Sequence, residues 1–512
     1  MELLRSADFS AYVRDRIRRD HVPGLAIALV RDDMIESVAF GKAALEPSRD
    51  CTPDSLFDIA SASKSLTAAA VAMLVSDDRY PLVRYDAAMS SLLPGDFVMP
   101  GTDHGHVTVD DVLGHRTGMP AHDSSYFGPQ AAQPDDARTI TRNLRNLALV
   151  APNRTQYMYN NMMYTAASYM VEQVTACPFS AFLRDNIFRP LGMNSTRLHP
   201  TQARAEALSH LIVDGHCWDP EAKRYLVVPF ADAPEAQGAG KVLTSVNDYA
   251  KWVKAVMNRQ APVTEDMYAE LLRKRISQEA PGDPASASSY YAAGWQVRHC
   301  GTHKLIWHEG SDDGFRSTHF FVPEFSFGGV ILTNSETSGD LIDSLTNQFV
   351  ESVVELSSGS PARPWTNPTL DESDSESQAH TDDRSDAESS SSFEEELRQE
   401  LCPGIGTDVL PQELPLSVYK GEYWNPGYRH FQVGEKGGVL FVDANDRSMA
   451  FCLTFEHICD QTKYIAYMKA GTERKGIPTK AEFILENGIA VRLGLQLEEF
   501  LKEYIWFDRV NK

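Results

Sequence analysis

The stretch that decides the fold is LFDIASASKSLTAAAVAMLV, residues 56–75. It passes from an extended apolar run into an Ala-rich segment that predicts a helix starting at Ser61. Residues three apart share one face of a helix, so Lys64 is expected beside the Ser61 hydroxyl. A serine hydroxyl is a weak nucleophile until a base takes its proton, which a neighbouring lysine can do. The pair is a candidate nucleophile and activator, although a helix-capping serine followed by a solvated lysine has the same letters.

Two later motifs favour the catalytic interpretation. Residues 157–161, YMYNN, stand directly before a helical run, and residues 307–311, WHEGS, belong to a region of predicted strands. Together with Ser61-x-x-Lys64 they give three motifs in order along the chain, which is more specific than any one of them alone.

Taken in order, Ser-x-x-Lys, Tyr-x-Asn and His-x-Gly resemble the motifs of the serine β-lactamase and penicillin-binding-protein superfamily. The resemblance is strongest to the class C β-lactamase-related hydrolases, which include esterases, D-aminopeptidases and D-alanyl-D-alanine carboxypeptidases. It covers about residues 10–356. The flanking segments that carry it are VDDVLGHRTGMP at 109–120, FRPLGMNST at 188–196 and GAGKVLTSVNDYAKWV at 238–253.

The resemblance implies a role for each matching residue of the catalytic set. Ser61 resembles the nucleophile that accepts the acyl group, and Lys64 resembles the lysine that activates it. Tyr159 resembles the tyrosine that acts as base in acylation and as acid toward the leaving group. Which of Lys64 and Tyr159 holds the proton at rest is left open by the sequence.

The resemblance also implies residues that bind substrate. Asn161 resembles an amide that contacts substrate and orients the lysine, and His308 would lie beside the leaving side or carboxylate of the substrate. Gly310 resembles the glycine that lets substrate approach the strand edge. The backbone N–H groups of Ser61 and Ser311 would form the oxyanion hole.

Two departures from the family pattern bear on the substrate. Asn160 stands where serine is usual, and His308-Glu309-Gly310 replaces Lys-Thr-Gly. An inward-facing Glu309 would repel substrates that carry a carboxylate, but strand alternation predicts that it faces away from the side occupied by His308. These differences argue against a true β-lactamase.

The predicted fold class is α+β. Residues 1–356 are expected to form a β-lactamase/transpeptidase-like domain, in which an antiparallel sheet flanked by helices is joined to a helical subdomain. Residues 357–413 are rich in Ser, Pro and acidic residues and predict a disordered acidic linker. Residues 414–512 show short alternating runs, about seven or eight candidate strands, and predict an antiparallel β-barrel. This last segment resembles the lipocalin-like barrel appended to several hydrolases of the family.

The composition limits the compartment and the partners. The chain has 512 residues with 48 Lys and Arg against 71 Asp and Glu, a net charge of −23. That sign disfavours nucleic acid as a partner. The seven cysteines are scattered without a CxxC spacing, which favours a reducing compartment. Without an apolar run of membrane length or a signal peptide, we expect a cytoplasmic protein with no membrane partner.

Three functions remain compatible with the sequence. The first is a serine hydrolase that forms an acyl-enzyme on Ser61 with a small ester, amide or peptide. The second is an acyltransferase of the same fold, in which an alcohol or amine replaces water, as in some secondary-metabolism relatives. The third is a non-catalytic scaffold. Acyl transfer needs no cofactor, and assembly of identical copies through the barrel domain is compatible with the family resemblance.

Two histidine motifs receive simpler interpretations. Asp103 and the sequence His104-Gly105-His106 suggest a metal site, but spacing places no third ligand there, so no metal is expected. His115 resembles a family histidine that holds a helix and a loop near the site. It is therefore predicted to be structural.

Overall fold

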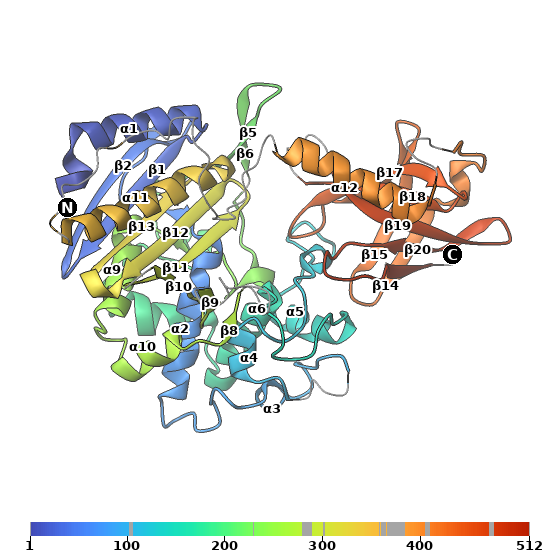
Figure 1. Cartoon of the computed structure of the whole chain (residues 1–512). Coiled ribbons are helices and arrows are strands. Elements are labelled where there is room, and N and C mark those ends of the chain that lie inside the picture. The colour runs from blue at the N-terminus through green and yellow to red at the C-terminus, as the bar shows by residue number, and fades with distance from the viewer. Residues whose placement is uncertain are drawn as a thin grey trace. The chain divides into compact units, whose positions relative to one another are not determined.

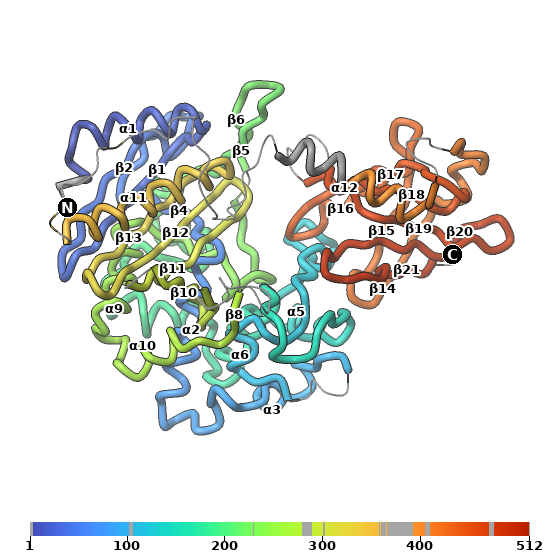
Figure 2. The backbone as a smooth tube through the Cα atoms, in the orientation of Figure 1, coloured from blue at the N-terminus to red at the C-terminus, as the bar shows by residue number. Residues whose placement is uncertain are grey.

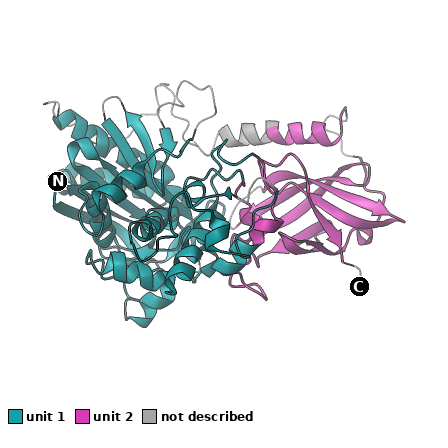
Figure 3. Cartoon of the chain, turned by 90° about the horizontal axis from the view of Figure 1, so that it is seen from below, with its two compact units in different colours: residues 1–118, 136–142, 151–372 teal, residues 119–135, 143–150, 373–512 magenta. Residues whose placement is uncertain are grey.

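The computed structural model describes residues 2–101, 106–228, 230–278, 289–300, 303–357, 359, 365, 385–404, 410–470 and 476–510. The chain forms two compact units (Figure 3). Unit 1 comprises residues 1–118, 136–142 and 151–372, and unit 2 comprises residues 119–135, 143–150 and 373–512.

Unit 1 is built around a nine-stranded sheet with the order β3-β2-β1-β13-β12-β11-β10-β9-β8. Strand β1 pairs antiparallel with β13, so the first and last parts of the unit share one sheet. Figure 2 shows the blue N-terminal strands beside the yellow strands that end this unit. The strands are β1 (Gly24–Arg31), β2 (Met34–Ala44), β3 (Arg49–Asp50), β8 (Ile276–Ser277), β9 (Ser289–Tyr291), β10 (Gln296–Cys300), β11 (His303–Asp312), β12 (Phe315–Val322) and β13 (Phe327–Thr333).

Helices cover both faces of this sheet. On one face, α1 (Ala7–Arg19) and α11 (Gly339–Ser357) bury Phe9 and Phe349 in a core shared with β1, β12 and β13 (Figure 1). On the other face, Tyr249 of α9 (Val246–Met257) meets His319 of β12 edge to face, with ring centroids 5.2 Å apart. Burial on both faces explains why β1 reads as a continuous apolar run.

The remaining elements of unit 1 are mostly short helices. Two small sheets pair β4 (Phe57–Asp58) with β7 (Leu243–Thr244) and β5 (Gly215–Asp219) with β6 (Arg224–Val228). The 3-10 helix η2 spans Ala60–Ser63 and leads into α2. The helices are α2 (Lys64–Val75), α3 (Met89–Leu92), α4 (Val109–Leu113), α5 (Ala137–Asn143), α6 (Asn161–Thr175), α7 (Phe179–Leu183), α8 (Pro200–Ala205) and α10 (Glu265–Leu272).

Unit 2 contains a closed barrel in which the strands from β14 to β21 follow one another in sequence order. The predicted antiparallel β-barrel is thus present. Its strands are β14 (Gly421–Asn425), β15 (Arg429–Lys436), β16 (Val439–Ala444), β17 (Phe451–Cys459), β18 (Lys463–Ala470), β19 (Ile477–Glu486), β20 (Ile489–Leu495) and β21 (Ile505–Arg509).

The segment predicted as a disordered linker, residues 357–413, differs in part from that prediction. Helix α12 spans Ser385–Leu401, and Leu397 and Leu401, four residues apart on one face, pack against Ile458 and Ile465 of the barrel. Upstream, the Trp365 ring lies 4.7 Å from that of Phe9 in unit 1. Trp365, Leu397 and Leu401 thus have packing partners, and residues 366–384 lie outside the described part of the chain.

The boundary between the units also departs from the predicted domains. Residues 119–135 and 143–150, which we assigned to the catalytic domain 1–356, pack with the barrel in unit 2. Phe127 lies between two guanidinium groups, 3.9 Å from Arg429 and 3.7 Å from Arg447. Glu498 accepts the backbone N–H of His122 at 2.8 Å. The residues in these contacts lie more than 300 positions apart in the sequence, so no local sequence pattern predicts them.

All seven cysteines are free thiols. Within the described part of the chain, no helix is both long and apolar enough to span a membrane.

Candidate active site

The predicted nucleophile and its lysine are in contact. Lys64 Nζ lies 2.9 Å from Ser61 Oγ. Ser61 sits in η2, so the α-helix itself begins at Lys64, three residues later than predicted. The preceding Ala60 has φ +45°, a left-handed conformation that is costly for a residue with a Cβ. The turn thereby presents the Ser61 hydroxyl at the start of α2.

Lys64 is completely buried and held by three oxygen atoms. Besides Ser61 Oγ, its Nζ donates to Asn161 Oδ1 and to the Ala239 carbonyl oxygen, both at 2.7 Å. An ammonium group has three N–H donors, so the arrangement matches the charged form. The Nζ atom also lies 4.6 Å from the centre of the Tyr159 ring. The structure therefore brings Ser61, Lys64, Tyr159 and Asn161 together.

His115 supports the loop that carries Tyr159. Its ring centroid is 4.3 Å from that of Tyr159, and its Nδ1 accepts the Asn160 backbone N–H at 3.1 Å. Asn160, which replaces the usual serine, is the N-cap of α6 and accepts the Met163 N–H at 3.1 Å. Burial, reinforced by the charge of Lys64, holds the pKa of His115 well below its usual value. These contacts are those of a positioning histidine.

His308 is buried and electrically neutral. Its Nδ1 donates to the Glu309 carbonyl oxygen at 2.6 Å, so its Nε2 accepts from the Tyr291 hydroxyl at 3.0 Å. Burial, followed by the charge of Lys64, lowers the pKa of His308 to about 3. The rings of His308 and Tyr159 have centroids 6.4 Å apart. His308 therefore supplies an uncharged imidazole where many family members have a lysine.

Glu309 faces away from this group. Its side chain is exposed and accepts the Trp307 indole N–H at 3.0 Å. Trp307 contributes to the core under α1 and α11, on the opposite face of β11 from the buried His308. The alternation predicted from the sequence is thus found.

Gly310 has a structural reason to lack a side chain. A Cβ there would lie 2.1 Å from the Ile59 carbonyl oxygen and 2.3 Å from Ser317 Oγ. Ser317 Oγ donates to the same Ile59 oxygen at 2.8 Å. The family resemblance attributes this glycine to substrate approach. In this chain its hydrogen also lets β11 close on the turn that carries Ser61.

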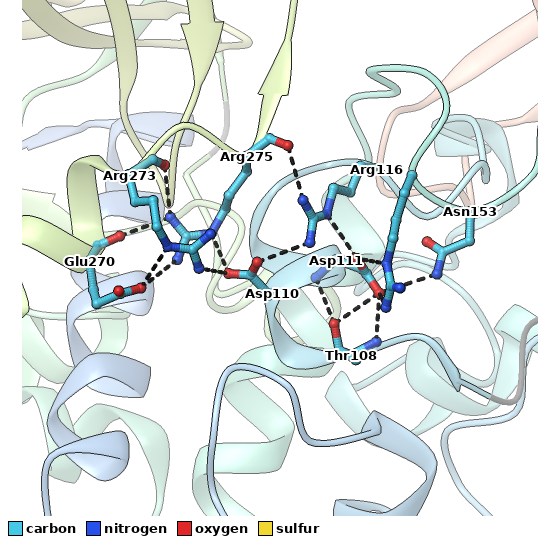
Figure 4. A network of polar contacts seen from close by, with 9 residues as sticks. Thr108, Asp110, Asp111, Arg116, Asn153, Glu270, Arg273 and Arg275 are labelled. Atoms are coloured by element: carbon cyan, nitrogen blue, oxygen red, sulfur yellow. Dashed lines mark hydrogen bonds and ion pairs between the residues drawn. The ribbon is translucent and has the colours of Figure 1, made fainter.

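A buried ionic network anchors the loop that follows α4 (Figure 4). Asp111 accepts bonds from Arg116 and Arg154, each at 2.8 Å. Asp110 accepts from Arg116 at 2.9 Å and from Arg275 at 2.8 Å. Burial alone would raise the pKa of Asp111, but its hydrogen bonds, led by Arg154, lower it to about 2. The network fixes the loop on either side of His115, and sequence analysis did not predict it because its members are dispersed along the chain.

Other residues near the site were also missed. The Ala239 carbonyl and the Tyr291 hydroxyl contact Lys64 and His308, and Asp58, Lys241 and Asp312 form an ionic cluster beside the Ser61 turn. Asp58 and Lys241 lie in stretches that drew attention beforehand, residues 56–75 and 238–253, but neither was given a role. Asp103 and His104, considered as metal ligands, lie outside the described residues.

The family model described as Beta-lactamase matches residues 9–349, more than half of the chain. The chain belongs to the β-lactamase family. Its members share the β-lactamase/transpeptidase-like fold of serine hydrolases, and the antiparallel sheet with flanking helices conforms to that fold. A second model, of a domain of unknown function, matches residues 408–509 of the barrel unit.

Curated relatives of this β-lactamase-family chain extend over both units. An unguisins hydrolase of Aspergillus campestris is 29% identical over 509 residues, which cover 98% of this chain and 91% of the relative. Another, of Aspergillus violaceofuscus, is 31% identical over 547 residues, covering 98% and 90%.

Solved structures show the same fold. The octameric penicillin-binding protein homologue from Pyrococcus abyssi has a TM-score of 0.58 at 19% identity and covers 98% of this chain and 99% of its own. The D-amino acid amidase from Ochrobactrum anthropi has a TM-score of 0.56 at 21% identity and covers 70% and 99%.

Proposed function

We propose that the protein is a serine hydrolase that cleaves a small ester or amide through an acyl-enzyme on Ser61. The observation that carries this proposal is the 2.9 Å contact between Ser61 Oγ and Lys64 Nζ beside the Tyr159 ring. The family membership supports a serine hydrolase, and the names of the two Aspergillus relatives support hydrolysis over transfer to another acceptor.

In the proposed acylation step, Tyr159 is the base. The charged Lys64 stabilises the Tyr159 phenolate, which takes the proton of Ser61 as Oγ attacks the carbonyl carbon. The backbone N–H groups of Ser61 and Ser311 bind the oxyanion. Tyr159 then gives its proton to the departing alcohol or amine as the acyl–O or acyl–N bond breaks.

Deacylation repeats these steps with water. The Tyr159 phenolate removes a proton from the water that attacks the acyl carbon, and the Ser61 oxygen leaves and is reprotonated by Tyr159. Asn161 keeps Lys64 oriented through its 2.7 Å hydrogen bond. No cofactor takes part in either step.

The state of His308 favours particular substrates. A neutral imidazole offers no positive charge to a substrate carboxylate, unlike the lysine of the family motif. We therefore propose acyl donors whose scissile group is not flanked by a carboxylate bound at this position. Simple esters and amides, including peptide bonds away from a free C-terminus, fit this requirement.

The experiment is the intact mass of the protein after treatment with a fluorophosphonate and, separately, after a pulse of p-nitrophenyl butyrate. The wild-type chain is expected to gain one adduct, and Ser61→Ala none. An adduct that persists in Ser61→Ala, or no adduct on the wild type, would refute the assignment of Ser61. Retention of the butyryl group until an added alcohol or amine removes it would instead favour the acyltransferase.

A further inference from the structure

Three ionisable side chains that the proposed reaction does not use lie together beside the Ser61 turn. Lys241 forms an ion pair with Asp312, and its Nζ lies 3.6 Å from Asp58 Oδ2. Asp58 is 1% exposed, and the Lys241 and Asp312 side chains are 21% and 23% exposed. Each of the three belongs to a different segment that contributes to the site.

Asp58 holds the turn that presents the nucleophile. Its Oδ1 accepts the Ala60 N–H at 2.7 Å, directly before Ser61. Ala60 occupies the left-handed region, so this backbone conformation persists only where its surroundings fix it. The other oxygen, Oδ2, has no hydrogen-bond partner among the described residues, and the nearby Lys241 supplies its compensating charge.

Lys241 holds the segment that contacts the catalytic lysine. It follows Ala239, whose carbonyl accepts from Lys64, by two residues, and its own φ is +71°. Next to it, Val242 accepts the Ile59 N–H at 3.0 Å and donates its N–H to Ser63 Oγ at 3.2 Å. Displacement of Lys241 would therefore move both the turn and an oxygen that orients Lys64.

Asp312 ties the third segment into the cluster. It is the last residue of β11 and directly follows Ser311, whose N–H we assign to the oxyanion hole. One ammonium group thus connects the end of β11 to the Ser61 turn.

The charge balance makes Lys241 the central member. Burial and the neighbouring Asp312 raise the pKa of Asp58, against the opposing effect of Lys241. Burial would also raise the pKa of Asp312, but Lys241 outweighs it and keeps that pKa below its usual value. Removal of the lysine would leave two carboxyl groups next to each other in a poorly hydrated place, where one must take up a proton or move.

We propose that Asp58, Lys241 and Asp312 form an ionic staple of positioning residues that sets the Ser61 turn, the Ala239 carbonyl and the Ser311 N–H in register for acylation. This inference rests on the proposed function. A staple of this kind acts on the geometry of the reacting groups, so its loss lowers the rate of acylation and leaves substrate binding nearly unchanged. A cluster that only stabilises the fold would alter the unfolding midpoint without that selective effect.

The experiment compares Lys241→Met and Lys241→Arg with the wild type in the full-length chain. We measure the rate constant for labelling by a fluorophosphonate, and kcat and KM for p-nitrophenyl butyrate. Lys241→Met is expected to lower the labelling rate constant and kcat by about 30-fold, since small misplacements of reacting groups cost up to about 100-fold, while KM changes less than about twofold. Lys241→Arg restores the charge and is expected to recover the rates to within about threefold.

Lys251→Met is the matched control. Lys251, on α9 of the same unit, pairs with Asp248 at 2.9 Å and donates to the Gly192 carbonyl oxygen, so its loss removes a comparable ion pair without an expected effect on kcat. Asp58→Asn keeps an oxygen for the Ala60 N–H while it removes the charge, and an approximately tenfold fall in kcat is expected. If Lys241→Met does not fold, Asp58→Asn provides the test of the staple instead.

The outcomes separate this inference from the function on which it rests. A wild-type chain labelled on Ser61, with Lys241→Met and Asp58→Asn labelled at the wild-type rate, would overturn the staple and leave the hydrolase intact. Equal losses in Lys241→Met and Lys251→Met, or no rescue by arginine, would also overturn it. A wild-type chain that is not labelled at all would refute the proposed function and the staple together.

Discussion

Two lysines beside the Ser61 turn differ in what surrounds them. Lys64 is completely buried and donates to three neutral oxygen atoms, from Ser61, Asn161 and Ala239. Lys241 is slightly exposed and faces two carboxylates. Burial is the main cause of the lowered pKa of His308 and of His115, and the nearby charge of Lys64 lowers both further. The charge of Lys241 acts mainly on the neighbouring Asp58 and Asp312. We propose that Lys64 takes part in the chemistry and that Lys241 holds the backbone geometry.

The strongest test of this difference is substitution at Lys64. Lys64→Met is expected to lower the fluorophosphonate labelling rate constant about 1,000-fold, the scale of one electrostatic stabiliser lost from an active site. Lys64→Arg is expected to be as impaired, because the planar guanidinium cannot reproduce the three converging bonds of the ammonium group. Circular dichroism should confirm that both variants fold. Arginine is expected to restore the rates at position 241 but not at position 64. If Lys64→Arg were active, the two lysines would not differ in this way.

The next test asks which of the two lysine charges acts on His308. It measures the free energy of unfolding as a function of pH. His308 has a folded-state pKa of about 3 against about 6.5 when unfolded, so the unfolded chain binds the extra proton. The free energy of unfolding is thus at its full value above about pH 6.5 and falls as the pH drops toward 3. One such group contributes up to about 1.4 kcal/mol per pH unit.

Because Lys64 is the second cause of this shift after burial, Lys64→Met should raise the folded-state pKa of His308 and reduce the loss of stability between pH 7 and pH 5. Lys241→Met should leave the contribution of His308 to this loss of stability unchanged. Urea unfolding of the three proteins at both pH values, with an NMR titration of His308, measures this. If both variants changed the pKa of His308 by the same amount, the prediction that only Lys64 acts on His308 would be wrong.

The proximity of Ser61, Lys64, Tyr159 and Asn161 could be predicted because these residues lie in short motifs. Ser61 and Lys64 are one helical turn apart, and Tyr159 and Asn161 stand at the start of a helix, so local spacing places their side chains. The alternation of β11 likewise predicted the opposite faces of His308 and Glu309. The antiparallel sheet and the barrel followed from the strand patterns and the family resemblance.

The groups that hold the site in place could not be predicted in this way. Asp58, Lys241 and Asp312 come from three segments whose proximity is created only by the fold, and the same is true of the arginines around Asp110 and Asp111. The helix within the supposed linker was missed because the apolar face of Leu397 and Leu401 is short and surrounded by acidic residues. Tertiary packing overrides such weak local signals.

The smallest expected effect is at Glu309, which is adjacent to His308 in sequence but lies on the other face of β11. Glu309→Gln removes a full charge one residue from the site, yet kcat and KM for p-nitrophenyl butyrate should change by less than about twofold, because an exposed charge is screened by solvent. The amide oxygen can still accept the Trp307 indole N–H, so stability should also be retained. A change of tenfold or more in KM for a substrate with a carboxylate, compared with its neutral ester, would mean that Glu309 faces the substrate. The alternation of β11 would then not separate Glu309 from the site, and its charge would act on the reaction from a position where solvent is expected to screen it.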